Sequence, residues 1–162
     1  MCGVALLVGP HAASHRRAFD AMMDAIEDRG ESQEIDISDT ALIGTARLKI
    51  VDRDNAIQPW MSRDGRWALC YNGEVFNHKA LRTQLQSLGH EQRSASDTEV
   101  VLESYLAWGE DALLKFRGEF AFAIVDRLTD RVFLARDPAG VKPLYWARRD
   151  GHLLIASEVK AL

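Results

Sequence analysis

Cysteine and histidine are scarce in this sequence, which argues against disulfide-stabilised and zinc-binding proteins. Only two cysteines, Cys2 and Cys70, occur among 162 residues, too few for a disulfide framework. None of the five histidines has a cysteine neighbour at ligand spacing, so we expect no metal site. No apolar run approaches the roughly 18–20 residues that a membrane-spanning helix needs, so we expect no membrane partner.

Basic residues are also fewer than acidic ones. The 20 Lys and Arg residues against 24 Asp and Glu give a net charge of −4, whereas a nucleic-acid-binding protein would need a basic surface. The apolar residues 2–8 have no basic residue before them and are too few for a signal peptide, which predicts a cytoplasmic protein. With 47% apolar and 27% charged residues, the composition is that of one globular domain over residues 1–162.

Hydrophobic periodicity predicts strands at both ends of the sequence and helices in the middle. Residues 2–8 form a short apolar run before Gly9-Pro10, which indicates a buried strand. A first helix is predicted between the N-cap Ser14 and Gly30 at its C′ position. The later predictions are β-rich stretches at 41–52 and 66–76, a helix from Asn77 to Gly89, and a helix opened by the capping box Ser96–Glu99.

Turn-forming residues divide the chain after Gly118 into four short apolar strands, FAFAIVD, RVFLAR, KPLYWA and HLLIAS. We expect one antiparallel meander covered on both faces, because these strands are mostly apolar. Helices beside a largely antiparallel sheet define the α+β class, and the apolar strands favour two sheets stacked between helix layers.

Cys2 directly follows the initiator methionine, so removal of Met1 would make it the N-terminal residue. An α-amino group titrates near 7.7–8.0, so roughly a tenth of it is free base at pH 7. A thiol and a proton acceptor within one residue give the chemistry of N-terminal nucleophile enzymes. The alternative is that Cys2 is a small apolar residue at the start of a buried strand.

The dipeptide Asn72-Gly73 has a structural and a functional interpretation. Between two β-rich runs, Asn-Gly is the strongest short-range signal for a hairpin turn. The side-chain amide of Asn72 and the backbone N–H of Gly73 could instead both donate to a developing oxyanion. Without further information, the hairpin is favoured.

Three charged residues stand where a charge needs a partner. Arg47 lies in the apolar run ARLKIVD, so a carboxylate should pair with it. That carboxylate could belong to a substrate or to an internal Asp or Glu. Asp97 and Glu74 could likewise pair with a substrate or with an internal charged residue. Asp97 could also simply stabilise a helix N-terminus as an anion. Arg136, Asp137 and Lys142 are interpreted as turn and ion-pair residues in preference to catalytic ones, and Cys70 as a core residue.

Seven motifs occur in series along the chain: MCG, RLKIVD, YNGEVFN, SDTEVV, FRGEFAFAIVD, LARDPAGVKPLY and IASEVKAL. Together they resemble the class II glutamine amidotransferase domain of the glutamine-hydrolysing asparagine synthetases. The resemblance implies a four-layer αββα sandwich of the Ntn-hydrolase (N-terminal nucleophile) kind, with two mainly antiparallel sheets. It also implies hydrolysis of glutamine to glutamate and ammonia, which a synthetase domain then uses.

The resemblance assigns a role to each candidate residue. Cys2 corresponds to the nucleophile, with its own α-amine as base. The oxyanion hole corresponds to Asn72 and Gly73. The remaining substrate-binding positions are Arg47 for the α-carboxylate, Asp97 for the α-ammonium with Glu74 beside it, and Val51 at the end of the segment that lines the glutamine pocket.

The expected partners are L-glutamine, an ATP-dependent synthetase domain or subunit and, as an open alternative, a second copy in a homodimer. The sequence has no Ser-Gly-Gly pyrophosphate loop and no G-x-x-x-x-G-K-[ST] motif. We therefore expect no cofactor in this domain, and ATP and Mg only in a synthetase part outside this chain. On its own the chain would be at most a glutaminase.

Two departures from the family pattern concern glutamine binding. Asp28-Arg29-Gly30-Glu31-Ser32 stands where the family has His-Arg-Gly-Pro-Asp, and Thr45-Ala46 replaces His-Glu or His-Thr before the clasping arginine. These changes suggest a relative with a specialised acceptor. Two alternatives to the glutaminase are a catalytically silent structural domain of an asparagine-synthetase-like cyclase and an Ntn amidohydrolase for another amide.

Overall fold

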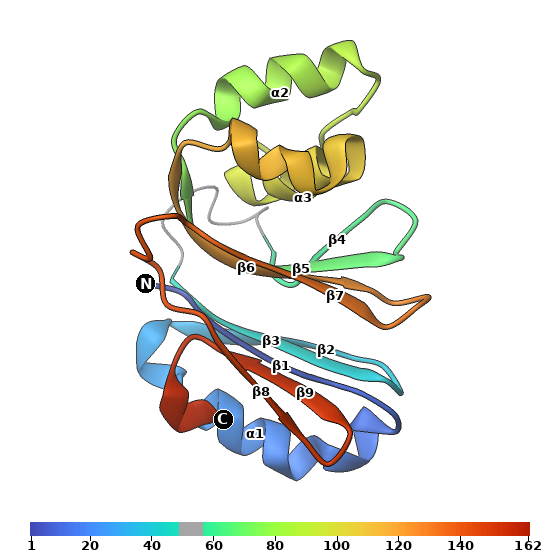
Figure 1. Ribbon diagram of the computed structural model, residues 1–162, viewed down its shortest axis with the longest axis vertical. Helices are drawn as coiled ribbons and strands as arrows, with labels where there is room; N and C mark the ends of the chain where they lie inside the picture. The colour runs from blue at the N-terminus through green and yellow to red at the C-terminus, as the bar shows by residue number, and fades with distance from the viewer. Residues whose placement is uncertain (49–56) are drawn as a thin grey trace.

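Two antiparallel sheets lie face to face in the computed structural model, which describes residues 1–48 and 57–162 (Figure 1). The first sheet has the order β2 (Ser32–Ile37), β3 (Ala41–Arg47), β1 (Gly3–Val8), β9 (His152–Ala156), β8 (Tyr145–Arg149). The second has the order β4 (Trp60–Met61), β5 (Trp67–Val75), β6 (Gly118–Asp126), β7 (Arg131–Arg136). The predicted strand at residues 2–8 is confirmed as β1.

Helices cover the outer face of each sheet, which confirms the predicted α+β class and the αββα layers (Figure 1). Helix α1 (Arg16–Asp24) packs on the first sheet, and α2 (His78–Ser87) and α3 (Asp97–Trp108) pack on the second. The short 3₁₀ segments are η1 (Ala12–His15), η2 (Glu27–Arg29), η3 (Gly109–Lys115) and η4 (Val159–Ala161). Across the described ranges, no helix has the length and apolarity to cross a membrane.

The buried residues between the two sheets have mainly small and β-branched side chains. Val4 and Leu6 of β1 meet Cys70 of β5 and Ala123 of β6 in one buried cluster. Cys70 is fully buried, which confirms it as a core residue, and this burial raises the pKa of its thiol to about 12.

The first helix is shorter than its apolar periodicity predicts. It ends at Asp24, and the chain continues through η2 to Gly30, whose backbone is extended rather than left-handed. Gly30 is therefore not a C′ residue; a β-carbon there would collide with the backbone of Ala46 and Arg47. Ser14 is not the N-cap either, because its hydroxyl donates to the carbonyl of His11 within η1.

The expected C-terminal meander is divided between the sheets. Strands β6 and β7 form a hairpin in the second sheet, whereas β8 and β9 form a hairpin in the first. Asp137 holds the crossing segment by accepting the backbone N–H groups of Val141 (2.9 Å) and Lys142 (3.0 Å). Arg136 donates to the Lys142 carbonyl, so the structural interpretation of both residues is confirmed. Edge strand β8 leaves Trp146 exposed and is not covered on both faces.

The predicted start of α3 is confirmed, although its capping differs from a capping box. The Ser96 hydroxyl accepts the Thr98 N–H at 3.1 Å and caps the helix. Glu99 does not reach back to Ser96, because its carboxylate accepts the N–H groups of Arg93 and Ser94. The buried Glu99 thus fixes the loop that leads into α3.

Candidate functional site

Asn72 and Gly73 lie inside strand β5, so the hairpin interpretation is wrong. The strand runs without interruption from Trp67 to Val75 and pairs over its whole length with β6. Asn72 is opposite Ala121, and Gly73 is opposite Phe120. A β-carbon on Gly73 would collide with the backbone carbonyl of Glu119, so glycine permits the close approach of the two strands.

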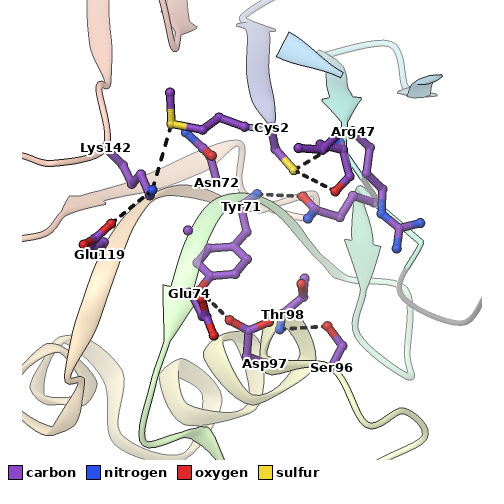
Figure 2. A pocket seen from close by; sticks show the side chains of 14 residues that line it. Cys2, Arg47, Tyr71, Asn72, Glu74, Ser96, Asp97, Thr98, Glu119 and Lys142 are labelled. Carbon is purple, nitrogen blue, oxygen red and sulfur yellow. Dashed lines mark hydrogen bonds and ion pairs between the residues drawn. The ribbon is translucent and has the colours of Figure 1, made fainter. Parts of the chain in front are cut away.

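A cavity of about 160 Å³ opens at this end of β5 (Figure 2). Strands from both sheets, helix α3 and the N-terminus contribute to its wall. The lining residues are Met1, Cys2, Arg47, Leu48, Gln58, Tyr71, Asn72, Gly73, Glu74, Ser96, Asp97, Thr98, Glu119 and Lys142. The structure thus brings together every predicted site residue except Val51, which lies outside the described residues.

Cys2 is partly buried at the entrance to strand β1. Its sulfur accepts the backbone N–H of Leu48 at 3.4 Å, so the end of β3 fixes the thiol. Arg29, from the divergent segment after α1, donates to the Cys2 carbonyl at 3.1 Å and pairs with Glu158. Met1 acylates the nitrogen of Cys2 in this chain, and its own side chain is largely exposed.

The side-chain amide nitrogen of Asn72 is buried and has no hydrogen-bond partner among the described residues. Asn72 is only 2% exposed and lines the same cavity as Cys2. A buried donor without an acceptor costs about 1–3 kcal/mol and is rare in native proteins. An acceptor supplied by a ligand in the cavity would remove this cost.

The exposed edge of β5 presents a second donor beside Asn72. Strand β4 pairs only with Ala68 and Leu69, and beyond them side chains take its place. The N–H of Tyr71 donates to Gln58 Oε1 at 2.9 Å, and that of Val75 donates to Asp97 Oδ2 at 3.0 Å. Because N–H groups alternate along a strand, that of Gly73 points to this edge between them.

Asp97 is buried in the first turn of α3, where the helix N-terminus favours a negative charge. Its Oδ2 atom also accepts the hydroxyl of Tyr71 at 2.7 Å. Burial, together with the neighbouring charge of Asp97, raises the pKa of Tyr71 well above its usual value. Within the described part of the chain, no cationic side chain lies within ion-pair distance of Asp97.

Arg47 is 4% exposed at the end of β3, and its charge has an internal partner. Glu34 of β2 places Oε1 at 3.8 Å from Arg47 Nη1, and its Oε2 accepts the Gln58 N–H at 2.8 Å. The expectation that a carboxylate pairs with Arg47 is therefore confirmed, and in this structure that carboxylate is an internal one. A charge-assisted hydrogen bond is shorter, about 2.7–2.9 Å, so the pair is not at optimal geometry.

Charged side chains also stand at the mouth of the cavity. Glu74 is exposed there, and Lys142 contacts Glu119 at 3.2 Å, which confirms Lys142 as an ion-pair residue. Sequence reasoning missed Gln58 and Tyr71, because nothing in their local sequence distinguishes them from structural residues, and only the fold brings them to the cavity. In the ranges that the structure describes, no group of three His, Cys, Asp or Glu residues could hold a metal ion.

Comparison with known proteins gives a consistent match. A family described as "Glutamine amidotransferase domain" matches residues 1–162. Asparagine synthetase [glutamine-hydrolyzing] 3 of Bacillus subtilis (strain 168) is 34% identical over all of this chain, which spans 27% of that protein. Asparagine synthetase B [glutamine-hydrolyzing] of Escherichia coli (strain K12) is 35% identical over 89% of this chain and 28% of its own length.

A solved structure shares the fold. Glutamine phosphoribosylpyrophosphate amidotransferase from B. subtilis superposes with a TM-score of 0.80 and 22% identity, over 99% of this chain and 42% of that chain. The likeness confirms the expected four-layer Ntn-hydrolase sandwich. This chain spans less than a third of the two synthetases described above.

Proposed function

This chain belongs to the glutamine amidotransferase domain family, and we therefore propose that it hydrolyses the side-chain amide of L-glutamine to glutamate and ammonia. The observation that carries the proposal is the buried amide nitrogen of Asn72, which lacks an acceptor among the described residues and lies in one cavity with Cys2. A tetrahedral oxyanion formed by attack of Cys2 would supply that acceptor.

The first half of the reaction forms a thioester. Removal of Met1 frees the α-amine of Cys2, which takes the thiol proton as the sulfur attacks the amide carbon of glutamine. The carbonyl oxygen becomes an oxyanion, and the Asn72 amide and the Gly73 N–H donate to it. The C–N bond then breaks, and the proton held by the α-amine passes to the departing nitrogen, which leaves as ammonia.

The second half releases glutamate. A water molecule loses a proton to the same α-amine and attacks the thioester carbon, and the same two donors stabilise the second oxyanion. Cleavage of the C–S bond returns the proton to the sulfur. In this proposal the nucleophile of the first half, the base and the two oxyanion donors all come from the domain's own residues.

The charged residues that line the cavity would recognise the α-amino and α-carboxylate groups of glutamine. Arg47 would bind the α-carboxylate, and its long contact with Glu34 would yield to the shorter one with the substrate. Asp97 would bind the α-ammonium, with Glu74 beside it at the mouth. Val51 lies outside the described residues and is assigned to glutamine binding only by its correspondence to the family.

The ammonia would serve an ATP-dependent, asparagine-synthetase-like amide ligase. This rests on the two synthetases that contain a region similar to this chain in little more than a quarter of their length. In this proposal ATP and Mg belong to the synthetase part or to a partner subunit. The acceptor that receives the ammonia is then chosen outside this domain.

Release of ammonia from glutamine tests the proposal. Cys2→Ala should abolish turnover and block alkylation by a glutamine-like diazoketone. Cys70→Ala is the matched control, because Cys70 is fully buried in the core and should not be needed for turnover. A folded protein with a free Cys2 amine that releases no ammonia would reject the glutaminase and favour a catalytically silent structural domain.

A further inference from the structure

Tyr71 takes no part in the proposed chemistry, but its hydroxyl donates a hydrogen bond to the carboxylate of Asp97. The hydroxyl donates to Oδ2 at 2.7 Å, and the same oxygen accepts the backbone N–H of Val75 at 3.0 Å. The other oxygen, Oδ1, accepts no hydrogen bond from the described residues. Two donors therefore hold one oxygen of Asp97 and leave the second one available at the cavity.

The position of Tyr71 in β5 explains how the strand reaches α3. Successive side chains of a strand point to opposite faces. Figure 2 shows Tyr71 directed toward Asp97 and Asn72 directed toward the N-terminal residues. Tyr71 is 2% exposed, so bulk water cannot replace its contact with Asp97. Burial also keeps the phenol protonated, because it raises the Tyr71 pKa.

We propose that Tyr71 is a positioning residue that turns the free oxygen of Asp97 toward the α-ammonium of glutamine. This rests on the proposed function, because it assigns Asp97 to that ammonium. A carboxylate rotates readily about its last side-chain bond. With Oδ2 held by the Tyr71 hydroxyl and the Val75 N–H, rotation would break both hydrogen bonds, and Oδ1 keeps one direction.

Tyr71→Phe tests the proposal with two substrates, L-glutamine and glutaramate, which lacks the α-amine. We expect KM for glutamine to rise about tenfold while kcat stays within about twofold. Kinetics with glutaramate should match the wild type, because no ammonium is present to use Asp97. A merely structural role would affect both substrates alike, and that result, or an unchanged KM for glutamine, would overturn the proposal.

Tyr105→Phe is the matched control. Tyr105 lies in the same layer between α3 and the second sheet, where its ring packs against Trp67 and Phe133. It does not line the cavity, so loss of its hydroxyl should leave both substrates unaffected. Thermal unfolding of both variants checks that each one is folded.

Asp97→Asn provides a second test if Tyr71→Phe does not fold. The Val75 N–H can only donate, so the asparagine oxygen must take the place of Oδ2 and its NH₂ group the place of Oδ1. The substituted side chain would then present a donor to the ammonium. We therefore expect the KM for glutamine of Asp97→Asn to be as high as, or higher than, the KM of Asp97→Ala. Tighter binding by Asp97→Asn would mean that the carboxylate is not held, and would overturn the proposal.

Failure of the proposed function has a separate signature. If the wild type with a free Cys2 amine releases no ammonia from either amide, the glutaminase proposal fails. Calorimetric binding of glutamine then decides the role of Tyr71. Weaker binding by Tyr71→Phe than by Tyr105→Phe would support it, and equal binding, or no binding even by the wild type, would reject it.

Discussion

Replacing Asn72 with leucine should separate the stability of this domain from its activity. The amide nitrogen of Asn72 is buried without a partner among the described residues, a state that costs about 1–3 kcal/mol. Leucine is similar in size and removes the unsatisfied donor, so the free energy of unfolding should rise by roughly 1 kcal/mol. In a domain of this length, that corresponds to a Tm increase of about 2–4 °C.

Activity should change in the opposite direction. In the proposed reaction the same nitrogen donates to the oxyanion, and loss of one such donor typically lowers kcat by 10²–10³, about 2.7–4 kcal/mol. Because the donor acts in the transition state, KM for glutamine should change little. Calorimetric unfolding and steady-state ammonia release, measured on the same preparation, give the two quantities.

Gln92→Met is the control for this experiment. Both polar atoms of the Gln92 side chain are also buried without partners in the described part of the chain, but Gln92 does not line the cavity. It should gain stability with unchanged kcat. An Asn72→Leu variant that is folded and retains wild-type kcat would refute the role of Asn72 in the oxyanion hole. A Tm lowered by several degrees would refute the argument that its amide is unsatisfied.

Two further predictions concern the N-terminus and acid stability. Intact mass of active protein should show that Met1 is absent, because an acylated nitrogen cannot serve as base; full activity with Met1 retained would contradict this. The bidentate contact with Arg66, helped by Thr129, holds the pKa of Asp126 well below its usual range although burial opposes this. Because this pKa is lower in the folded than in the unfolded protein, ionised Asp126 stabilises the fold above about pH 4. This stabilisation decreases as the pH falls further and the carboxylate becomes protonated. The difference in Tm between the wild type and Asp126→Asn should therefore decrease as the pH is lowered from about 5. A difference that does not change with pH would contradict the lowered pKa of Asp126.

Much of the fold could be predicted because its signals are local. The apolar run of β1, the periodicity of α1 and the turn formers between β6 and β7 each depend on a few neighbouring residues. The candidate site was predicted in another way, by motifs that resemble a family. The structure brings Cys2 and Asn72 into one cavity although 70 positions of sequence numbering separate them.

Other features depend on contacts between distant segments and left no local signal. Strand β2 was missed because SQEIDI alternates weakly, and only its pairing with β3 makes it a strand. The turn at Asp137 looks like any hairpin connection, yet it carries the chain from one sheet to the other. Asn-Gly favours a hairpin by local propensity, but nine residue pairs with β6 override that preference.

The same pairing explains how one short strand serves several parts of the site. In β5, Asn72 points to one face, Tyr71 points to the other face, and the Gly73 N–H lies in the plane of the sheet at its edge. A shift of one residue against β6 would exchange the two faces and separate Asn72 from Cys2. Glycines at 73 and 118 oppose such a shift, because each allows a backbone approach that would collide with a β-carbon. The registration of β5 with β6 is therefore a condition for the proposed chemistry, and it depends on residues that take no part in that chemistry through a side chain.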